Sequence, residues 1–183
     1  MEKVEGLKIF ILPVGEIPAE IINGLVKPIE ERFGYPAKIL EKIPVPETSF
    51  DSRRKQYFAS TILKELEKKL PKESLRLLGI IDRDLYATGF NFIFGQAGGK
   101  VCLVSMYRFK PCSWELLKKE EENLLLSRVI KTTIHELGHT FGLEHCKDNQ
   151  CVMYFSNWLG DTDRKSDKFC PKHQEEIKEI LGL

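Results

Sequence analysis

Two histidines lie four residues apart in the segment His135-Glu-Leu-Gly-His139, and a third, His145, follows six residues later. In an α-helix, side chains at positions i and i+4 lie on the same face, one turn apart, so both imidazoles can bind one ion. Gly142 stands between the second and third histidines. A glycine ends a helix easily because it adopts left-handed backbone angles, which lets the chain turn back towards the same ion. The spacing therefore predicts a metal site of three histidines.

Zinc suits such a set of ligands. It binds neutral imidazole at about 2.0–2.1 Å and takes four ligands in a tetrahedron. Three histidines leave one position for water, which is typical of a catalytic site. Glu136 follows the first histidine, roughly 100° around the helix, where its carboxylate can lie beside a zinc-bound water. We therefore expect a catalytic zinc at His135, His139 and His145, with Glu136 as the general base.

The length of the histidine pattern separates it from a chance match. In a chain of this composition, His-Glu-x-x-His should arise by chance in about one chain in a hundred. Extending the pattern to the glycine and the third histidine lowers the expectation to about one in a hundred thousand. The apolar residues of this helix fall in one sector, while His135 and His139 fall roughly opposite. The two histidines are therefore expected to face a cleft instead of the core.

The cysteines and histidines are unevenly distributed. All four histidines lie beyond residue 134, and three of the five cysteines are interleaved with them. The cysteines are Cys102, Cys112, Cys146, Cys151 and Cys170. An odd number in a reducing compartment indicates metal ligands or buried thiols more than a disulfide framework. The C-terminal segment is therefore expected to handle metal, and Cys102, in an apolar run, is expected in the core.

The elements that position these residues follow from hydrophobic periodicity. Strands are predicted at 7–14, 36–46, 75–82, 90–94 and 101–106. Helices are predicted at 18–33, at 51–70, from about Trp114 or Glu120 to Phe141, and at 167–181. The glycine-rich segment 95–99 is expected to be the turn of a hairpin, and 146–168 to be mostly loop. Helices that alternate with strands predict an α/β (α+β) fold, a mixed twisted sheet with helices packed on it.

Composition narrows the class of protein. With 183 residues, 42% of them apolar and 30% charged, the chain fits one soluble domain. Its formal net charge of +1 argues against binding to nucleic acid or to an anionic membrane surface. It contains neither an apolar run of about 18 residues nor a basic start followed by an apolar stretch. We expect a cytoplasmic monomer.

Beyond the third histidine, the sequence resembles the metzincin metallopeptidases and, within them, the archaemetzincins. That family continues with a cysteine, a second cysteine five positions on, a methionine two later and a distal Cys-x-x-Cys. The corresponding residues are His145-Cys146, Cys151-Val-Met153 and Cys170-Pro-Lys-His173. The resemblance implies a second, structural zinc at Cys146, Cys151, Cys170 and His173. It also implies that Met153 forms the "Met-turn", an apolar floor beneath the three histidines.

Two positions depart from the family pattern. His173 replaces the last cysteine; zinc accepts three thiolates and one imidazole, and Cys112 is the alternative fourth ligand. Some metzincins have a tyrosine two residues after the methionine that reaches the metal. Phe155 occupies that position here, with Tyr154 next to it, so a tyrosyl ligand is not expected.

We therefore expect a zinc-dependent metallopeptidase that hydrolyses peptide bonds through a zinc-bound water, with two zinc ions per chain and a peptide or protein substrate. Residues 1–183 would form a single catalytic domain. Residues 1–142 would carry the sheet and the active-site helix, and 143–183 a small zinc-stabilised subdomain. An edge strand at 90–94 would pair with extended substrate. The alternative is a catalytically silent, zinc-stabilised binding or scaffold protein.

Overall fold

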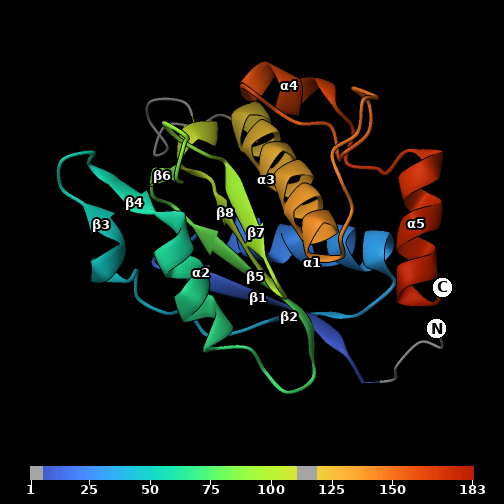
Figure 1. The fold of residues 1–183 in the computed structure, drawn as a ribbon, viewed down its shortest axis with the longest axis horizontal. Helices are drawn as coiled ribbons and strands as arrows, with labels where there is room; N and C mark the ends of the chain where they lie inside the picture. Colours follow the sequence, from blue (N-terminus) through green and yellow to red (C-terminus); the bar gives the residue numbers. More distant parts are fainter. Residues whose placement is uncertain (1–5, 111–118) are drawn as a thin grey trace.

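The computed structural model describes residues 6–110 and 119–183 and contains a central five-stranded sheet in the order β2-β1-β5-β8-β7 (Figure 1). Its strands are β1 (Lys8–Val14), β2 (Ala37–Ile39), β5 (Ser74–Ile81), β7 (Gly95–Gly98) and β8 (Val101–Ser105). β1 pairs in parallel with β2 and β5, and β5 in parallel with β8. β7 pairs antiparallel with β8. The prediction of a mixed sheet is confirmed.

Helices cover both faces of this sheet, which explains why β1 is apolar at almost every position. Ile9 and Ile11 pack with α1 (Ala19–Phe33) and α3 (Lys119–Thr140) on one face. Phe10 and Leu12 pack with α2 (Ala59–Glu67) on the other face. Successive side chains of a strand point to opposite faces, so a strand that is covered on both sides must be apolar throughout. Figure 1 shows α2 on the opposite side of the sheet from α1 and α3.

The C-terminal segment packs on α1 and α3. α4 (Leu159–Arg164) contacts α3, and α5 (Pro171–Leu181) contacts α1. Val152, Met153 and Ile177 are fully buried and belong to the same core cluster as α1 and α3. Arg128 of α3 forms two 2.7 Å hydrogen bonds to the Asp163 carboxylate of α4. The polar face of α3 is therefore covered by residues that follow it in the sequence.

A second, three-stranded sheet in the order β3-β4-β6 corrects the prediction of a helix from 51 to 70. It consists of β3 (Phe50–Asp51), β4 (Gln56–Phe58) and β6 (Leu85–Tyr86). Asp51 accepts hydrogen bonds from the backbone N–H groups of Arg53 and Arg54, and Lys55 has a positive φ of 55°. This turn, built on the Asp51 side chain, folds β3 against β4, so α2 begins only at Ala59. Single-turn 3₁₀ helices precede β3 (η1, Glu47–Ser49) and follow β8 (η2, Tyr107–Phe109).

The hairpin before α3 differs from the prediction in its bounds. The glycine-rich segment expected as the turn is itself the strand β7, while 90–94 runs outside the five-stranded sheet, with one isolated bridge between Ile93 and Leu85. The turn falls at 99–100, where Gly99 has a φ of +56°. Glycine suits position 95 of β7 because this strand lies against α3, where a Cβ atom on Gly95 would lie 2.6 Å from Cγ of Glu136.

The predicted strand 36–46 is shorter in the structure, where β2 ends at Ile39 and Ile43 forms only an isolated bridge with Val14. The remaining boundaries agree closely with the sequence. α3 ends at Thr140, and Gly142 adopts a left-handed φ of +90°, as predicted for the end of the helix. α5 begins at Pro171, later than the expected position 167, since proline suits the first turn of a helix. Trp114 and Cys112 lie outside the described residues. Within the described ranges, the helices are too short or too polar to span a bilayer.

Candidate metal centres

The end of α3 brings together His135, His139 and His145. The Nε2 atom of His139 lies 3.1 Å from Nε2 of His135 and 3.1 Å from Nε2 of His145. All three nitrogens lie within 4.8 Å of one another. The first two side chains are one helical turn apart, and the bend at Gly142 returns the third to them. The structure thus places the three residues as the sequence pattern predicts.

The hydrogen bonds of these rings orient their lone pairs towards one point. Nδ1 of His135 donates to the Val152 carbonyl at 2.8 Å, and Nδ1 of His139 donates to the Leu143 carbonyl at 2.8 Å. A carbonyl only accepts, so each Nδ1 must carry the hydrogen and each Nε2 must be a bare acceptor. Acceptors 3.1 Å apart repel each other unless a cation lies between them. The cluster therefore fits a metal ion.

Burial keeps the three imidazoles neutral, as metal ligands must be. Loss of solvation lowers the pKa of His135 well below its usual value, and the Lys165 charge lowers it further. Burial is also the main cause that lowers the pKa of His139 and of the more exposed His145. Neutral imidazole is the form that binds zinc, so protonation does not compete with the metal at neutral pH.

Glu136 lies beside this cluster in a tightly packed position. Its side chain is 7% exposed, and burial raises its pKa to about 8, an effect that the Lys165 charge partly offsets. The backbone of Gly95 in β7 passes directly over the carboxylate: a Cβ atom on Gly95 would lie 2.6 Å from Cγ and 2.8 Å from Oε1 of Glu136. The edge strand therefore holds the carboxylate in place from above.

Met153 supports α3 from below. Its side chain is fully buried, and its sulfur atom lies where a Cβ on Gly138 would approach to 2.6 Å. Gly138 precedes His139 on α3, so the methionine packs under the helix turn between the two helical ligands. A tight turn from Cys151 to Tyr154 carries it, closed by a 2.9 Å backbone hydrogen bond. Phe155 packs edge-on against the His145 ring, 4.8 Å between ring centres, and offers no ligand atom.

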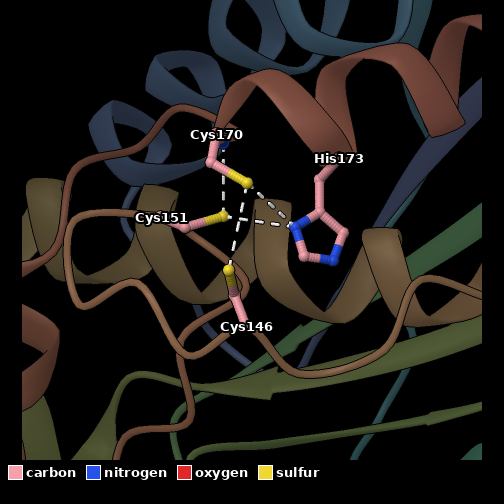
Figure 2. Close-up of side chains that lie close together, drawn as sticks. All are labelled: Cys146, Cys151, Cys170 and His173. Atoms are coloured by element: carbon pink, nitrogen blue, oxygen red, sulfur yellow. Dashed lines mark hydrogen bonds between the residues drawn. The ribbon is translucent and has the colours of Figure 1, made fainter.

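A second cluster lies between the loop after α3 and the start of α5. It consists of Cys146, Cys151, Cys170 and His173, whose potential ligand atoms lie within 4.8 Å of one another (Figure 2). The sulfur atoms of Cys146 and Cys170 are 3.9 Å apart. Nδ1 of His173 lies 3.2 Å from Cys170 Sγ and 3.6 Å from Cys151 Sγ. His173 is 2% exposed, and burial raises the pKa of the Cys151 thiol to about 12.

The distances in this second cluster fit a tetrahedral zinc ion. Bonds of about 2.3 Å to sulfur and 2.0 Å to nitrogen separate two sulfurs by about 3.8 Å, and a sulfur from a nitrogen by about 3.5 Å. The observed separations, 3.9 Å and 3.2–3.6 Å, match those values. Four protein ligands leave no position for substrate, which is typical of a structural site. Cys102 is fully buried in the core, as expected.

The histidine cluster lies at the floor of a cavity of about 710 Å³. One wall is the segment 87–96, which includes the exposed Phe90 and the start of β7. Another wall is formed by residues of the C-terminal segment, namely Phe155, Ser156, Asn157, Thr162 and Lys165. Glu136 faces the same cavity. Ligand atoms, a carboxylate and an open volume therefore meet at one place.

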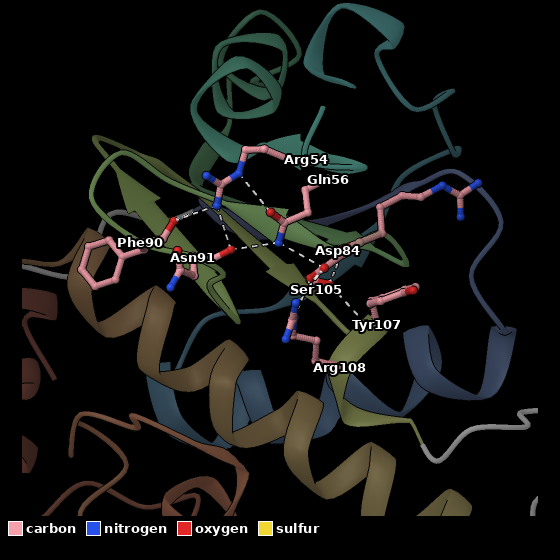
Figure 3. A network of polar contacts seen from close by, with 9 residues as sticks. Arg54, Gln56, Asp84, Phe90, Asn91, Ser105, Tyr107 and Arg108 are labelled. Atoms are coloured by element: carbon pink, nitrogen blue, oxygen red, sulfur yellow. Dashed lines mark hydrogen bonds and ion pairs between the residues drawn. The ribbon is translucent and has the colours of Figure 1, made fainter. Parts of the chain in front are cut away.

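A polar network fixes the outer wall of this cavity (Figure 3). Arg54 donates to the carbonyls of Phe90 and Asn91, and Gln56 donates to the same Asn91 carbonyl and to Asp84. Arg108 holds the Asp84 carboxylate with hydrogen bonds of 2.6 and 2.8 Å. Although 90–94 is no strand of the central sheet, it is tied to the small sheet by its backbone carbonyls.

Lys165 was not identified from the sequence. It is 3% exposed, and its Nζ donates to the Tyr154 carbonyl at 3.0 Å. Burial lowers its pKa to about 8, and the nearby Glu136 carboxylate opposes that effect. Lys165 directly follows α4 in a stretch without hydrophobic periodicity, so no local pattern marks it as different from a surface lysine. Only the packing of this stretch on α3 buries it.

The fold and the two metal-ligand clusters together define the class of protein. A His-Glu-x-x-His helix and a third histidine after a glycine bend meet at one cavity, with a methionine packed against the helix, the arrangement of a zinc metallopeptidase. The family model described as peptidase family M54 matches residues 19–179. The chain therefore belongs to peptidase family M54, the archaemetzincins.

Known archaemetzincins match along nearly the whole chain. That of Pyrococcus furiosus is 38% identical over 182 residues, which covers 95% of this chain and 94% of the relative. The crystal structure of archaemetzincin from Methanopyrus kandleri superposes with a TM-score of 0.84 at 36% identity, covering 98% of both chains. That of the Archaeoglobus fulgidus protein, complexed with malonate, has a TM-score of 0.79 at 31% identity, covering 93% of this chain and 99% of the other.

Proposed function

We propose that this protein hydrolyses peptide bonds, with its catalytic zinc held by His135, His139 and His145. One observation carries the proposal: the Nε2 atoms of three imidazoles converge in the lining of an open cavity. A structural site would be closed by a fourth side chain, whereas here Phe155 lies next to His145 and cannot ligate. Membership of a peptidase family supports a peptide or protein as the substrate.

The reaction divides the chemistry between the metal and Glu136. A zinc ion held by His135, His139 and His145 would supply a water molecule of lowered pKa, from about 15.7 towards about 7, and a Lewis acid for the substrate carbonyl. Glu136 takes the proton from the attacking water on its carboxylate and then delivers it to the departing amine. The Gly95 backbone packs against the Glu136 side chain and limits its movement during both transfers. His135 and His139 keep their orientation through the carbonyls of Val152 and Leu143.

Substrate binding involves the exposed edge of the sheet. β7 pairs on one side with β8 and has no further strand beside it in the sheet order of the described residues. We propose that an extended peptide pairs with β7, Gly95–Gly98, in place of the segment 90–94 inferred from sequence. The segment at Phe90 and Asn91, whose carbonyls are hydrogen-bonded to Arg54, would then form one side of the groove that holds the peptide.

A second zinc at Cys146, Cys151, Cys170 and His173 would order the C-terminal segment, bringing the total to two ions per chain. Because Cys146 directly follows His145, the structural site also positions a catalytic ligand. We propose that residues 1–183 act as one catalytic domain, with 1–142 carrying the sheet and α3 and with 143–183 as a zinc-stabilised subdomain. The protein would act as a monomer.

The substitution Glu136→Gln tests the proposal. The amide keeps the size of the side chain and cannot accept the proton, so zinc content should stay near that of the wild type while peptide cleavage falls by about 10²–10⁴-fold. Cleavage is measured by mass spectrometry on a peptide library of random sequence, and zinc by elemental analysis. Glu144→Gln, on an exposed residue beside His145, is the matched control and should leave cleavage unchanged.

The same experiment separates the enzyme from a silent scaffold. If the wild type and Glu136→Gln both carry the full zinc complement and neither cleaves any peptide in the library, the protein is a zinc-stabilised binding protein. Equal cleavage by both proteins would instead remove Glu136 from the mechanism.

A further inference from the structure

Lys165 is a buried ammonium group with too few acceptors. It is 3% exposed and lines the catalytic cavity. Nζ donates to the Tyr154 carbonyl at 3.0 Å and lies 3.5 Å from Nδ1 of His135. That Nδ1 carries a hydrogen bonded to the Val152 carbonyl, so it accepts nothing from Lys165. Two of the three ammonium hydrogens thus lack an acceptor among the described residues.

Two hydroxyl groups on the same wall also lack partners. Thr162 is 1% exposed, and its Oγ1 has no hydrogen-bond partner among the described residues. The buried Oγ of Ser156 also has no hydrogen-bond partner among the described residues. Both residues line the cavity together with Lys165. Most buried polar groups in native proteins are hydrogen-bonded, so three such groups on one cavity wall indicate a missing partner.

An anion that accepts several hydrogen bonds fits the place of the missing partner. No carboxylate of the described residues lies within ion-pair distance of Lys165: Asp161 pairs with Arg164, and Asp163 pairs with Arg128. A buried charge is costly unless an opposite charge and hydrogen bonds accompany it. A carboxylate has acceptor sites for about four hydrogen bonds, enough for the ammonium and both hydroxyl groups.

We infer that the wall formed by Lys165, Thr162 and Ser156 binds a carboxylate of the substrate. The inference rests on the proposed peptidase function and names its substrate class: peptides with an acidic group close to the cleaved bond. Two sources supply such a group, the side chain of an aspartate or glutamate and the free C-terminal carboxylate. A neutral amide in the same place would leave the Lys165 charge uncompensated, so the site should reject it.

Peptide pairs distinguish this role from a general effect of the charge. Starting from any peptide that the wild type cleaves, glutamate and glutamine are placed in turn at the two positions that flank the bond. At one of these positions, the wild type should cleave the glutamate peptide with a kcat/KM about tenfold or more above that of the glutamine peptide. Lys165→Met should reduce this ratio to near one. Equal losses on both peptides would exclude the acidic side chain as the bound group, and the comparison of chain ends below then decides whether the inference stands.

The two sources of the carboxylate require a separate comparison. Peptides that end one residue after the cleaved bond are made with a free C-terminus and as C-terminal amides. If the wild type prefers the free acid and Lys165→Met does not, the wall reads the chain end. If the preference is confined to the glutamate side chain, the wall binds an acidic side chain of the substrate. If neither pair shows a preference that depends on Lys165, the inference is wrong.

A binding measurement keeps this inference separate from the proposed function. Calorimetry on the zinc-loaded protein compares N-acetyl-glutamate α-amide with N-acetyl-glutamine α-amide. The acidic probe should bind about tenfold more tightly to the wild type and lose that advantage in Lys165→Met. A carboxylate that merely binds zinc would bind both proteins alike, which would contradict the inference. If the protein cleaves no peptide but shows the Lys165-dependent preference, the peptidase proposal fails and the carboxylate site stands.

Two further variants control for folding. Lys131→Met removes a lysine of α3 that donates to the Asp163 carbonyl and does not line this cavity, so the preference should persist. Thr162→Val keeps the side-chain shape and removes an unpartnered hydroxyl, so it should fold at least as well as the wild type. Its glutamate preference should nevertheless fall severalfold. An unchanged preference in both Thr162→Val and Lys165→Met would overturn the inference.

Discussion

The backbone carbonyl of Val152 accepts a 2.8 Å hydrogen bond from Nδ1 of His135. This bond joins the loop of the cysteine cluster to the histidine cluster, because Val152 directly follows Cys151 and precedes Met153. Outer partners of this kind set the tautomer and direction of a metal-binding imidazole. A change at the cysteine cluster can therefore shift the histidine cluster through the consecutive residues Cys151, Val152 and Met153.

Removal of the Cys151 thiol should therefore weaken both metal sites. We expect Cys151→Ser to lose the structural zinc and to weaken zinc binding at the histidines by about 10–100-fold, although Cys151 is no ligand there. Zinc affinity is measured by competition with a chelator. Cys102→Ser, in the core, is the thiol control and should retain both ions. Full, tight zinc binding at the histidines of Cys151→Ser would show that the sites are independent.

The contact between Gly95 and Glu136 predicts a selective loss of catalysis. A methyl group at Gly95 would come within 2.6–2.9 Å of the carboxylate, so the side chain must move. We expect Gly95→Ala to lower kcat by about 10²-fold, the size of effect that a displacement of about 1 Å can produce, with zinc content unchanged. Gly98→Ala on the same strand meets only Leu63 at 3.8 Å and should behave like the wild type. Similar kcat values for the two variants would contradict the proposed role of Glu136.

Variants at His173 test the fourth ligand of the cysteine cluster. We expect His173→Ala to lose one zinc per chain, whereas His173→Cys should retain it, because zinc accepts four thiolates as well as three thiolates and an imidazole. Cys112→Ser should have no effect on zinc content. Elemental analysis after dialysis against a weak chelator measures each protein. Loss of zinc from Cys112→Ser, with retention in His173→Ala, would identify Cys112 as the ligand.

The ion pair between Arg128 and Asp163 predicts a stability difference that depends on pH. The hydrogen bonds from Arg128 lower the pKa of Asp163 below its ordinary value of about 3.9. A carboxyl with a lowered folded-state pKa stabilises the fold above its unfolded pKa, and the contribution is lost as pH falls through the folded value. We expect Asp163→Asn to be less stable than the wild type at pH 7 by on the order of 1 kcal/mol, since the carboxylate is partly exposed. The difference in Tm should shrink below about pH 4. A difference that stays constant from pH 7 to pH 3 would rule out this ion pair as its cause.

Local sequence patterns were sufficient to predict most of the helices and strands, and also the metal ligands that lie near one another in the sequence. Alternation and helical spacing located β1, β5, β8, α1 and α3 within a few residues, because each buries one face or two against a neighbour. The histidine spacing predicts the metal cluster because it too depends on local structure, namely a helix of fixed pitch followed by a bend at a glycine. The segment 51–58 could not be predicted in this way, since a turn at Asp51 and pairing with the distant β6 override its helical spacing.

The amino-acid sequence by itself determined the fold class, the family and the residues able to hold metal, because these depend on periodicity and on short-range spacing. The tertiary structure decided which residues surround that metal. It placed Gly95 of β7 against Glu136, tied the Val152 carbonyl to His135, and buried Lys165 and Thr162 in the lining of the cavity. Each of these contacts joins segments far apart in the chain. Their energies come from burial and from loss of solvent, which exist only once the chain has folded.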